Sequence, residues 1–264
     1  MIDRKALKFS ARGFISSARP SPWTVALIAC AITELLAVLS FQISGKAQMV
    51  QAAAEYVQTQ NIDQYMHAVA AAQPGFLRML VDVLLSAMSL MISTGLTIFV
   101  IRTVRDGKGS VGNLLDGFAI LFRLIGYTLI SSIMIFFWSL LLIIPGIIAA
   151  LRYSQGIYLL LDHPEMTVFD CIQVSGEMMN GHKMERFELA FSFVGWLFSV
   201  SILSTVLGMF LPLLVVELLV LPLSAFVTIY LGFTFFLYYE ALQGRYYDPR
   251  VPAAERILPN DEEL

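Results

Sequence analysis

Six long apolar segments, separated by shorter polar stretches, dominate the pattern of this chain. A helix needs about 20 apolar residues to cross the hydrocarbon core of a bilayer, and all the segments except the fourth reach or approach that length. Backbone amides cannot stay unpaired in lipid, so each segment is expected to be helical. The sequence therefore predicts an all-α fold, a polytopic membrane helical bundle with six transmembrane helices. They are expected at residues 22–43, 79–101, 124–144, 146–161, 189–211 and 213–239.

Two proline-containing dipeptides mark boundaries between neighbouring segments. Pro145-Gly146 separates the third segment from the fourth, and Leu211-Pro212 separates the fifth from the sixth. Proline lacks the amide hydrogen and disfavours helical geometry in the residue before it, so it marks either a turn or a kink. The third and fourth segments therefore form either two spans or one kinked span.

The distribution of basic residues separates these two possibilities. With six spans and a cytoplasmic N-terminus, fourteen of the 17 Lys and Arg residues lie in cytoplasmic pieces, and only Lys46 and Arg78 lie outside. One kinked span would divide the basic residues almost evenly between the two sides. Because cytoplasmic loops carry an excess of Lys and Arg, we expect six spans with both termini cytoplasmic.

The expected organisation has three parts. They are a cytoplasmic basic amphipathic N-terminus at 1–21, a six-helix transmembrane domain at 22–241 and a cytoplasmic polar tail at 242–264. The N-terminal part forms either a helix lying on the inner membrane surface or a frayed basic anchor that sets the orientation. The outer loop at 44–75 forms either a helical hairpin over the outer face or a mobile loop.

The inner segment at 162–186 is expected to be an amphipathic helix along the inner surface. Asp162-x-Pro164 gives a helix-start signal before it. Its apolar stripe is too short and too polar to span the membrane. We expect Phe169, Ile172 and Met179 to face the bundle or lipid, and Glu177 to face water. The stripe consists of Val168, Cys171, Ile172, Ser175 and Met179.

Composition supports the membrane class and gives little catalytic chemistry. Hydrophobic residues make up 58% of the chain and charged residues 14%, against about 45–50% and 25% in soluble domains. The net charge of −3 gives no basic field for nucleic acid, and two cysteines form no disulfide framework. The histidines lie in separate loops without a zinc motif. We therefore expect no catalytic residues, no cofactor and no metal. The expected partners are the lipid bilayer and either a membrane protein or a second copy.

Four ionisable residues lie inside the predicted spans: Glu34, Asp82, Arg152 and Glu217. A charge inside the hydrocarbon is unfavourable by several kcal/mol, so it should face protein or water and find a partner. Counting along each span at about 1.5 Å per residue places all four in the outer half of the bilayer. They form either a polar cavity open to the outside that binds a cation or a zwitterion, or one Arg–carboxylate pair that holds helices together. Arg152 is expected to pair with Glu217, or else with Asp82.

A motif in the C-terminal part carries a family resemblance. Its residues include Pro145, Gly146, Arg152, Gly181, Phe187, Ser192, Phe193, Gly195 and Trp196. This stretch resembles domain-of-unknown-function family 975, an uncharacterised bacterial membrane family. It is also distantly similar to the membrane domain attached to some glycerophosphodiester phosphodiesterases. The resemblance implies a multi-pass, all-helical protein of the bacterial plasma (inner) membrane, and it brings no catalytic residues.

Three functions remain open from the sequence. The first is a non-enzymatic plasma-membrane protein, acting as an envelope, assembly or regulatory partner. The second is a small-solute or ion transporter that uses the outer-leaflet polar cluster. The third is a membrane enzyme acting on lipid, with the segment at 162–186 at the inner headgroups.

Overall fold

The computed structural model describes residues 3–246, and within this range all regular secondary structure is helical. Most of the tail at 242–264 lies outside the described residues. The described part contains six stretches long and apolar enough to cross a membrane, which confirms the predicted all-α fold and agrees with the predicted six spans. These stretches are Pro22–Ile43, Phe76–Asp106, Asn113–Leu141, Ile143–Asp162, Lys183–Gly208 and Val215–Leu242.

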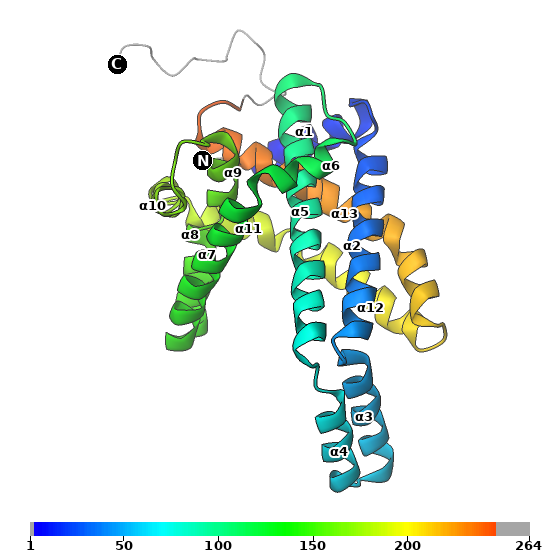
Figure 1. The fold of residues 1–264 in the computed structure, drawn as a ribbon. Helices are drawn as coiled ribbons and strands as arrows, with labels where there is room; N and C mark the ends of the chain where they lie inside the picture. The colour runs from blue at the N-terminus through cyan, green and yellow to red at the C-terminus, as the bar shows by residue number, and fades with distance from the viewer. Residues whose placement is uncertain (1–2, 247–264) are drawn as a thin grey trace, which may run out of the picture.

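The first two spans lie side by side and extend into a helical hairpin. Helices α2 (Pro22–Ile43) and α5 (Phe76–Asp106) pack together, and α3 (Lys46–Thr59) and α4 (Ile62–Ala72) project beyond them (Figure 1). The predicted outer loop is therefore a helical hairpin, one of its two expected forms. Below, the hairpin side of the bundle is the side that carries α3 and α4.

The third and fourth spans form a second hairpin. The short helices α6 and η1 lie away from the hairpin side of the bundle. From there α7 runs toward the hairpin side, and α8 returns antiparallel to α7 (Figure 1). A second break separates α8 from α9. The bounds are α6 Asn113–Asp116, η1 Gly117–Ile120, α7 Leu121–Leu141, α8 Ile143–Arg152 and α9 Gly156–Asp162.

The predicted break at Pro145-Gly146 is wrong by three residues. The chain turns at Leu142, whose backbone is extended (φ −165°, ψ 155°). Pro145 lies in the first turn of α8, where backbone amides have no carbonyl partner within the helix. The missing amide hydrogen of proline therefore costs no hydrogen bond there. A Cβ at Gly146 would overlap Ser139 of α7. The glycine therefore permits the close approach of α7 and α8, and the proline is compatible with the helix start.

The fourth span is two helices rather than one. The Tyr127 hydroxyl of α7 donates to the carbonyl of Tyr153, at the end of α8. Ser175 donates to the carbonyl of Arg152 at 2.8 Å and accepts from the amide of Gln155 at 3.2 Å. These bonds satisfy backbone groups that the break leaves without helical partners.

The amphipathic helix expected at 162–186 is shorter and starts later. Helix α10 spans Val168–Met178, because Thr167 and Asp170 form a capping box at its start. These hydrogen bonds from Thr167 hold the pKa of the Asp170 carboxyl below its usual range. Ile172 and Met179 are buried and Glu177 is exposed, as predicted. Phe169 is 68% exposed, so of its two expected environments, bundle or lipid, the bundle is excluded.

The last three helices complete the bundle. They are α11 (Lys183–Phe191), α12 (Val194–Gly208) and α13 (Leu213–Leu242). The fifth span is thus interrupted near Phe193, which is buried against Tyr230 of α13. The boundary predicted at Leu211-Pro212 is confirmed, since Pro212 directly precedes α13.

The N-terminal segment is a helix, one of its two expected forms. Helix α1 (Arg4–Ser17) packs against α13. Phe14 stacks on Phe233 with ring centroids 5.8 Å apart, and the hydroxyls of Ser10 and Tyr246 are 2.9 Å apart. The start and the described end of the chain therefore lie on one side, called the terminal side below.

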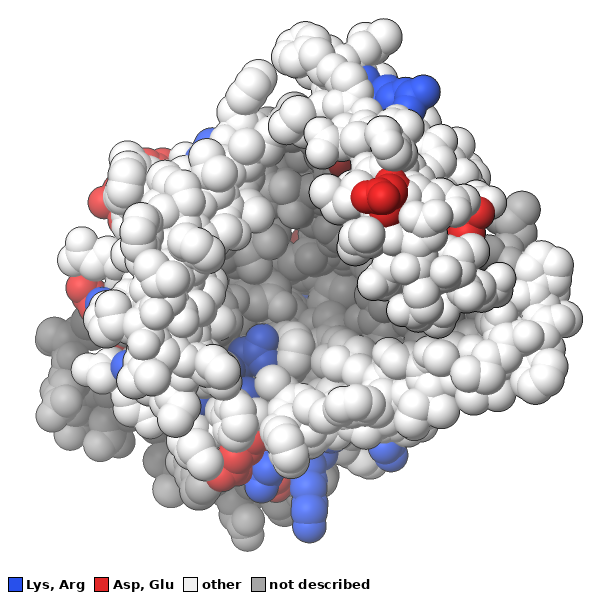
Figure 2. All heavy atoms as spheres, turned by 90° about the horizontal axis from the view of Figure 1, so that it is seen from below, with Lys and Arg blue, Asp and Glu red and all other residues white. Residues whose placement is uncertain are grey.

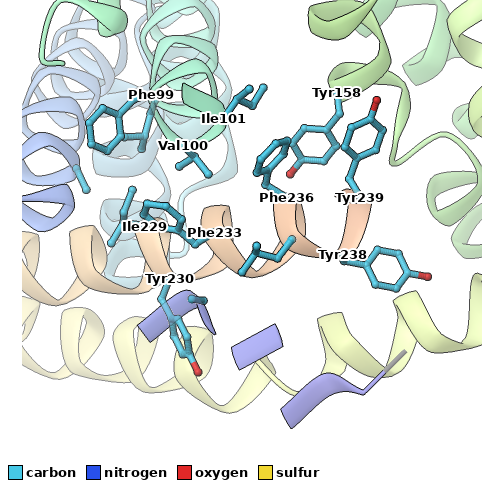
Figure 3. Close-up of a cluster of buried hydrophobic side chains, with 14 of the residues drawn as sticks. Phe99, Val100, Ile101, Tyr158, Ile229, Tyr230, Phe233, Phe236, Tyr238 and Tyr239 are labelled. Carbon is cyan, nitrogen blue, oxygen red and sulfur yellow. The ribbon is translucent and has the colours of Figure 1, made fainter. Parts of the chain in front are cut away.

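The hydrophobic core is concentrated toward the terminal side. Phe99 of α5, Tyr158 of α9, and Phe233 and Phe236 of α13 converge there (Figure 3). On the hairpin side the helix pairs α2–α5, α7–α8 and α12–α13 spread apart (Figure 1), and the surface seen from this side is hollowed (Figure 2). Helix α12 has no buried residue. The bundle is therefore tightly packed at one end and open at the other.

Candidate functional site: a charged network and three pockets

Four charged side chains meet on the terminal side, at the ends of three spans. Arg105 lies in the last turn of α5, Asp162 ends α9, Glu240 lies in the last turn of α13, and Arg245 follows α13. Asp162 accepts two hydrogen bonds from Arg105, at 2.7 and 2.8 Å. It also accepts one from the Tyr239 hydroxyl at 2.7 Å and one from Arg245 at 3.3 Å. These five residues are called the charged network.

Glu240 completes the charged network. It accepts from Nε of Arg105 at 3.0 Å and forms an ion pair with Nε of Arg245 at 3.2 Å. The Asp162 and Glu240 side chains are only 7% and 8% exposed. Buried carboxylates are stable only when charges and hydrogen bonds compensate them. Two guanidinium groups balance two carboxylates, so the network joins α5, α9 and α13 without a net charge.

A pocket of about 540 Å³ adjoins the charged network beneath α1. Phe9, Phe14 and Leu237 form part of its apolar wall, and Arg105 and Glu240 form part of its polar wall. Its lining also includes Ser10, Gly13, Ser17, Val104, Arg245 and Tyr246. The pocket is amphipathic, but its charged groups already pair with one another.

Sequence reasoning missed this network, although a signal was present. Arg105, Asp162 and Glu240 lie at the ends of the second, fourth and sixth spans. In any arrangement with six spans these ends reach the same membrane face. In the sequence, Arg105 contributes only to the charge asymmetry and Asp162 only to a helix-start signal.

The structure separates the four intramembrane residues predicted as one cluster. Asp82 accepts a hydrogen bond from Ser40 and lies 3.6 Å from Nζ of Lys46. Arg152 lies against α10, where a Cβ at Gly176 would be 2.6 Å from its Nε. Within residues 3–246, Arg152 forms no ion pair, so the predicted pair with Glu217 or Asp82 is not formed. The pair with Glu217 does not form because the two helices have different neighbours. Helix α8 packs against α7 and α11, whereas α13 packs against α1, α2 and α12.

Glu34 and Glu217 do come together. They line a pocket of about 330 Å³ between α2, α12 and α13, and they are close enough to interact electrostatically. Neither carboxyl forms an ion pair with a described basic residue. We call this the acid pocket; its other lining residues are Val200, Ser201, Ser204, Thr205, Val220 and Ser224.

A third pocket, of about 300 Å³, contains Arg152 together with Lys183. It lies between α7, α8 and the start of α11 and is called the basic pocket. Its other lining residues are Trp138, Pro145, Ile148, Ala149 and Tyr153.

The other residues of the family-like motif lie at a turn, at a helix end and at exposed positions. Gly181 has φ +83°, which only glycine adopts readily, and it turns the chain between α10 and α11. Ser192 donates to the carbonyl of Leu189, where α11 ends. Phe187 and Trp196 are 37% and 44% exposed, and a Cβ at Gly195 would meet nothing within 4 Å.

The fold and the charged helix ends define a multi-pass helical membrane protein. The family model described as "Protein of unknown function (DUF975)" matches residues 140–246, so the chain is similar to that family over this region. No curated protein and no solved structure matches the chain. The matched region runs from the tip of the α7–α8 hairpin to Tyr246. It includes the lining of the basic pocket except Trp138, and every member of the charged network except Arg105.

Proposed function

We propose that this chain is a non-enzymatic protein of a bacterial plasma membrane that binds a transmembrane helix of another protein. The acid pocket recognises a basic residue in that helix. The observation that supports this is the pair of carboxyls, Glu34 and Glu217, which share one pocket inside the spans without a basic partner. An ionisable group at this depth needs a partner of opposite charge, and the occupant we propose supplies it.

The surroundings of the acid pocket suit a helix. Helix α12, which forms one wall, has no buried residue, and its apolar side chains Leu203 and Val206 are 40% and 47% exposed. Ser201 and Ser204 line the pocket on the same helix. Small and hydroxyl side chains allow close approach and hydrogen bonding between helices in lipid.

A designed peptide tests this proposal. A leucine-rich transmembrane peptide of about 20 residues with one central lysine is mixed with the full chain in lipid nanodiscs. Association is measured by resonance energy transfer. We expect the lysine peptide to bind at least about tenfold more tightly than the same peptide with leucine. This preference should disappear in Glu34→Gln/Glu217→Gln, because the amides keep the shape and remove the charges.

A matched variant controls for net charge. Glu165→Gln/Glu177→Gln removes two exposed carboxyls outside the spans and should keep the preference. Equal binding of the lysine and leucine peptides by the unmodified chain would overturn the proposal.

The acid pocket also favours one second candidate, transport of a small cation. Two carboxyls and the hydroxyls of Ser201, Ser204 and Thr205 supply the oxygen atoms that hard cations prefer. Sodium uptake into proteoliposomes, lost in Glu34→Gln/Glu217→Gln, would support transport. Uptake without any peptide preference would replace the first candidate with the second.

We also propose that the terminal side is cytoplasmic and the α3–α4 hairpin is external, as the basic residues indicate. A cysteine in place of Gln60, exposed at the tip of the hairpin, should react with a membrane-impermeant maleimide in intact spheroplasts. Lys5→Cys should react only after lysis. Cys30 and Cys171 are buried and should give little background. The reverse labelling pattern would invert the topology.

A further inference from the structure

The basic pocket has two cationic side chains and no acidic one in its lining. We infer that it binds the phosphate group of an anionic phospholipid, held between Arg152 and Lys183. This inference does not depend on the acid pocket, which uses different helices and residues.

The cations of the basic pocket differ from those of the charged network. Arg105 and Arg245 are each paired with Asp162 and Glu240. In the described part of the chain, Arg152 and Lys183 form no ion pair. Two unpaired cations that line one pocket leave hydrogen-bond donors free for an anion.

Arg152 is an exposed side chain that packs against the protein on one side. Its guanidinium lies against Gly176 of α10 and 5.9 Å from the centre of the Tyr153 ring. The hydroxyl of Ser175 fixes the backbone of the same residue through its carbonyl. One side of the guanidinium therefore rests against the protein, and its remaining donors stay accessible to a ligand.

A third unpaired cation lies one helical turn along α11. Arg186 is only 8% exposed, and its Nε and Nη1 atoms have no hydrogen-bond partner. Its guanidinium lies 3.6 Å from the centre of the Phe235 ring. The nearest acid along this helix, Glu185, pairs with His182 at 3.1 Å. Arg186 is not part of the lining of the basic pocket, but it adds a second positive charge to α11 one turn from Lys183, which favours an anionic ligand nearby.

The remaining lining indicates a lipid as the source of the phosphate. Guanidinium groups bind phosphate oxygens in a bidentate manner, and an ammonium adds a point charge. Ile148 and Ala149 provide an apolar wall next to these donors. Trp138 and Tyr153 are side chains that favour the boundary between headgroups and hydrocarbon. Basic pockets between transmembrane helices are known to suit anionic headgroups.

Native mass spectrometry of the full chain in detergent tests the inference. The probes are phosphatidylglycerol and phosphatidylcholine, with inorganic phosphate and glycerol phosphate as soluble anions. We expect phosphatidylglycerol to bind about tenfold more tightly than phosphatidylcholine, because both carry the phosphate but the choline cation cancels its charge and is repelled by Arg152 and Lys183. Arg152→Gln/Lys183→Gln should abolish this preference. If the soluble anions bind as tightly as phosphatidylglycerol, the pocket recognises phosphate itself and not a lipid, which would contradict the inference.

Three controls keep the result interpretable. Arg78→Gln/Lys108→Gln removes two exposed cations elsewhere and should keep the preference. Arg152→Lys/Lys183→Arg retains both charges and should keep at least part of it. The thermal unfolding of each variant without added lipid shows that it is folded. A preference that persists in folded Arg152→Gln/Lys183→Gln, or that is absent from the unmodified chain, would refute the inference.

Discussion

Asp162→Asn is expected to lower the free energy of unfolding by about 3–5 kcal/mol, the usual result of breaking a buried charged group. The carboxylate accepts hydrogen bonds from Arg105, Tyr239 and Arg245 and is almost fully buried. The asparagine amide would turn donors toward two guanidinium groups, and Glu240 would remain as their single compensating charge. Chemical unfolding in detergent, followed by intrinsic fluorescence, measures the change.

An exposed ion pair provides the comparison for this result. Arg4 and Glu188 are 3.2 Å apart with half and a third of their side chains exposed. Glu188→Gln should change stability by less than about 1 kcal/mol. If Asp162→Asn has an equally small effect, the charged network does not stabilise the terminal side. A double-mutant cycle of Arg105→Gln with Asp162→Asn would then also show little coupling.

Gly95→Ala is expected to destabilise the bundle by about 1–3 kcal/mol or more, because the site is already fully packed. Gly95 lies in α5 where α6 crosses it. A Cβ there would lie 2.5 Å from backbone carbon atoms of Leu114, and backbone cannot rotate away as a side chain can. Gly117, at the start of η1, approaches the backbone of Met91 in the same way. The apparent melting temperature in detergent should fall clearly.

Gly208→Ala is the matched control for this substitution. It lies at the end of α12, and a Cβ there would meet nothing within 4 Å. Alanine has the higher helix propensity, so this change should be neutral or slightly stabilising. Equal effects of the two substitutions would mean that helix propensity, not the contact with Leu114, determines the response at Gly95.

The number of spans and their helical type were predictable because they depend on local properties. An apolar run of sufficient length must be helical in lipid, and the basic residues favoured two separate spans over one kinked span. The exact boundary was less predictable. Pro145 is compatible with either a turn or a helix start, and the choice depends on how Gly146 packs against Ser139, which lies in another helix.

The partners of the charged residues were not predictable from depth alone. Arg152 and Glu217 matched in their counted distance from the membrane edge, but α8 and α13 lie in different parts of the bundle. Glu34 and Glu217 share a pocket because α2 packs on α13. The charged network depends on helix ends, whose common membrane face follows from the number of spans, while their lateral proximity follows from packing.

The position of α1 has a consequence for the order in which the protein is assembled. Lys8 lies 4.3 Å from the centre of the Phe193 ring, and Ser10 contacts Tyr246, which is 236 residues further along the chain. During synthesis, α1 emerges long before these partners. The apolar face of α1 therefore contacts lipid or a chaperone until α13 has entered the membrane. The packing of α1 on α13 is thus a late step of assembly, and it occurs only after the last span is in place.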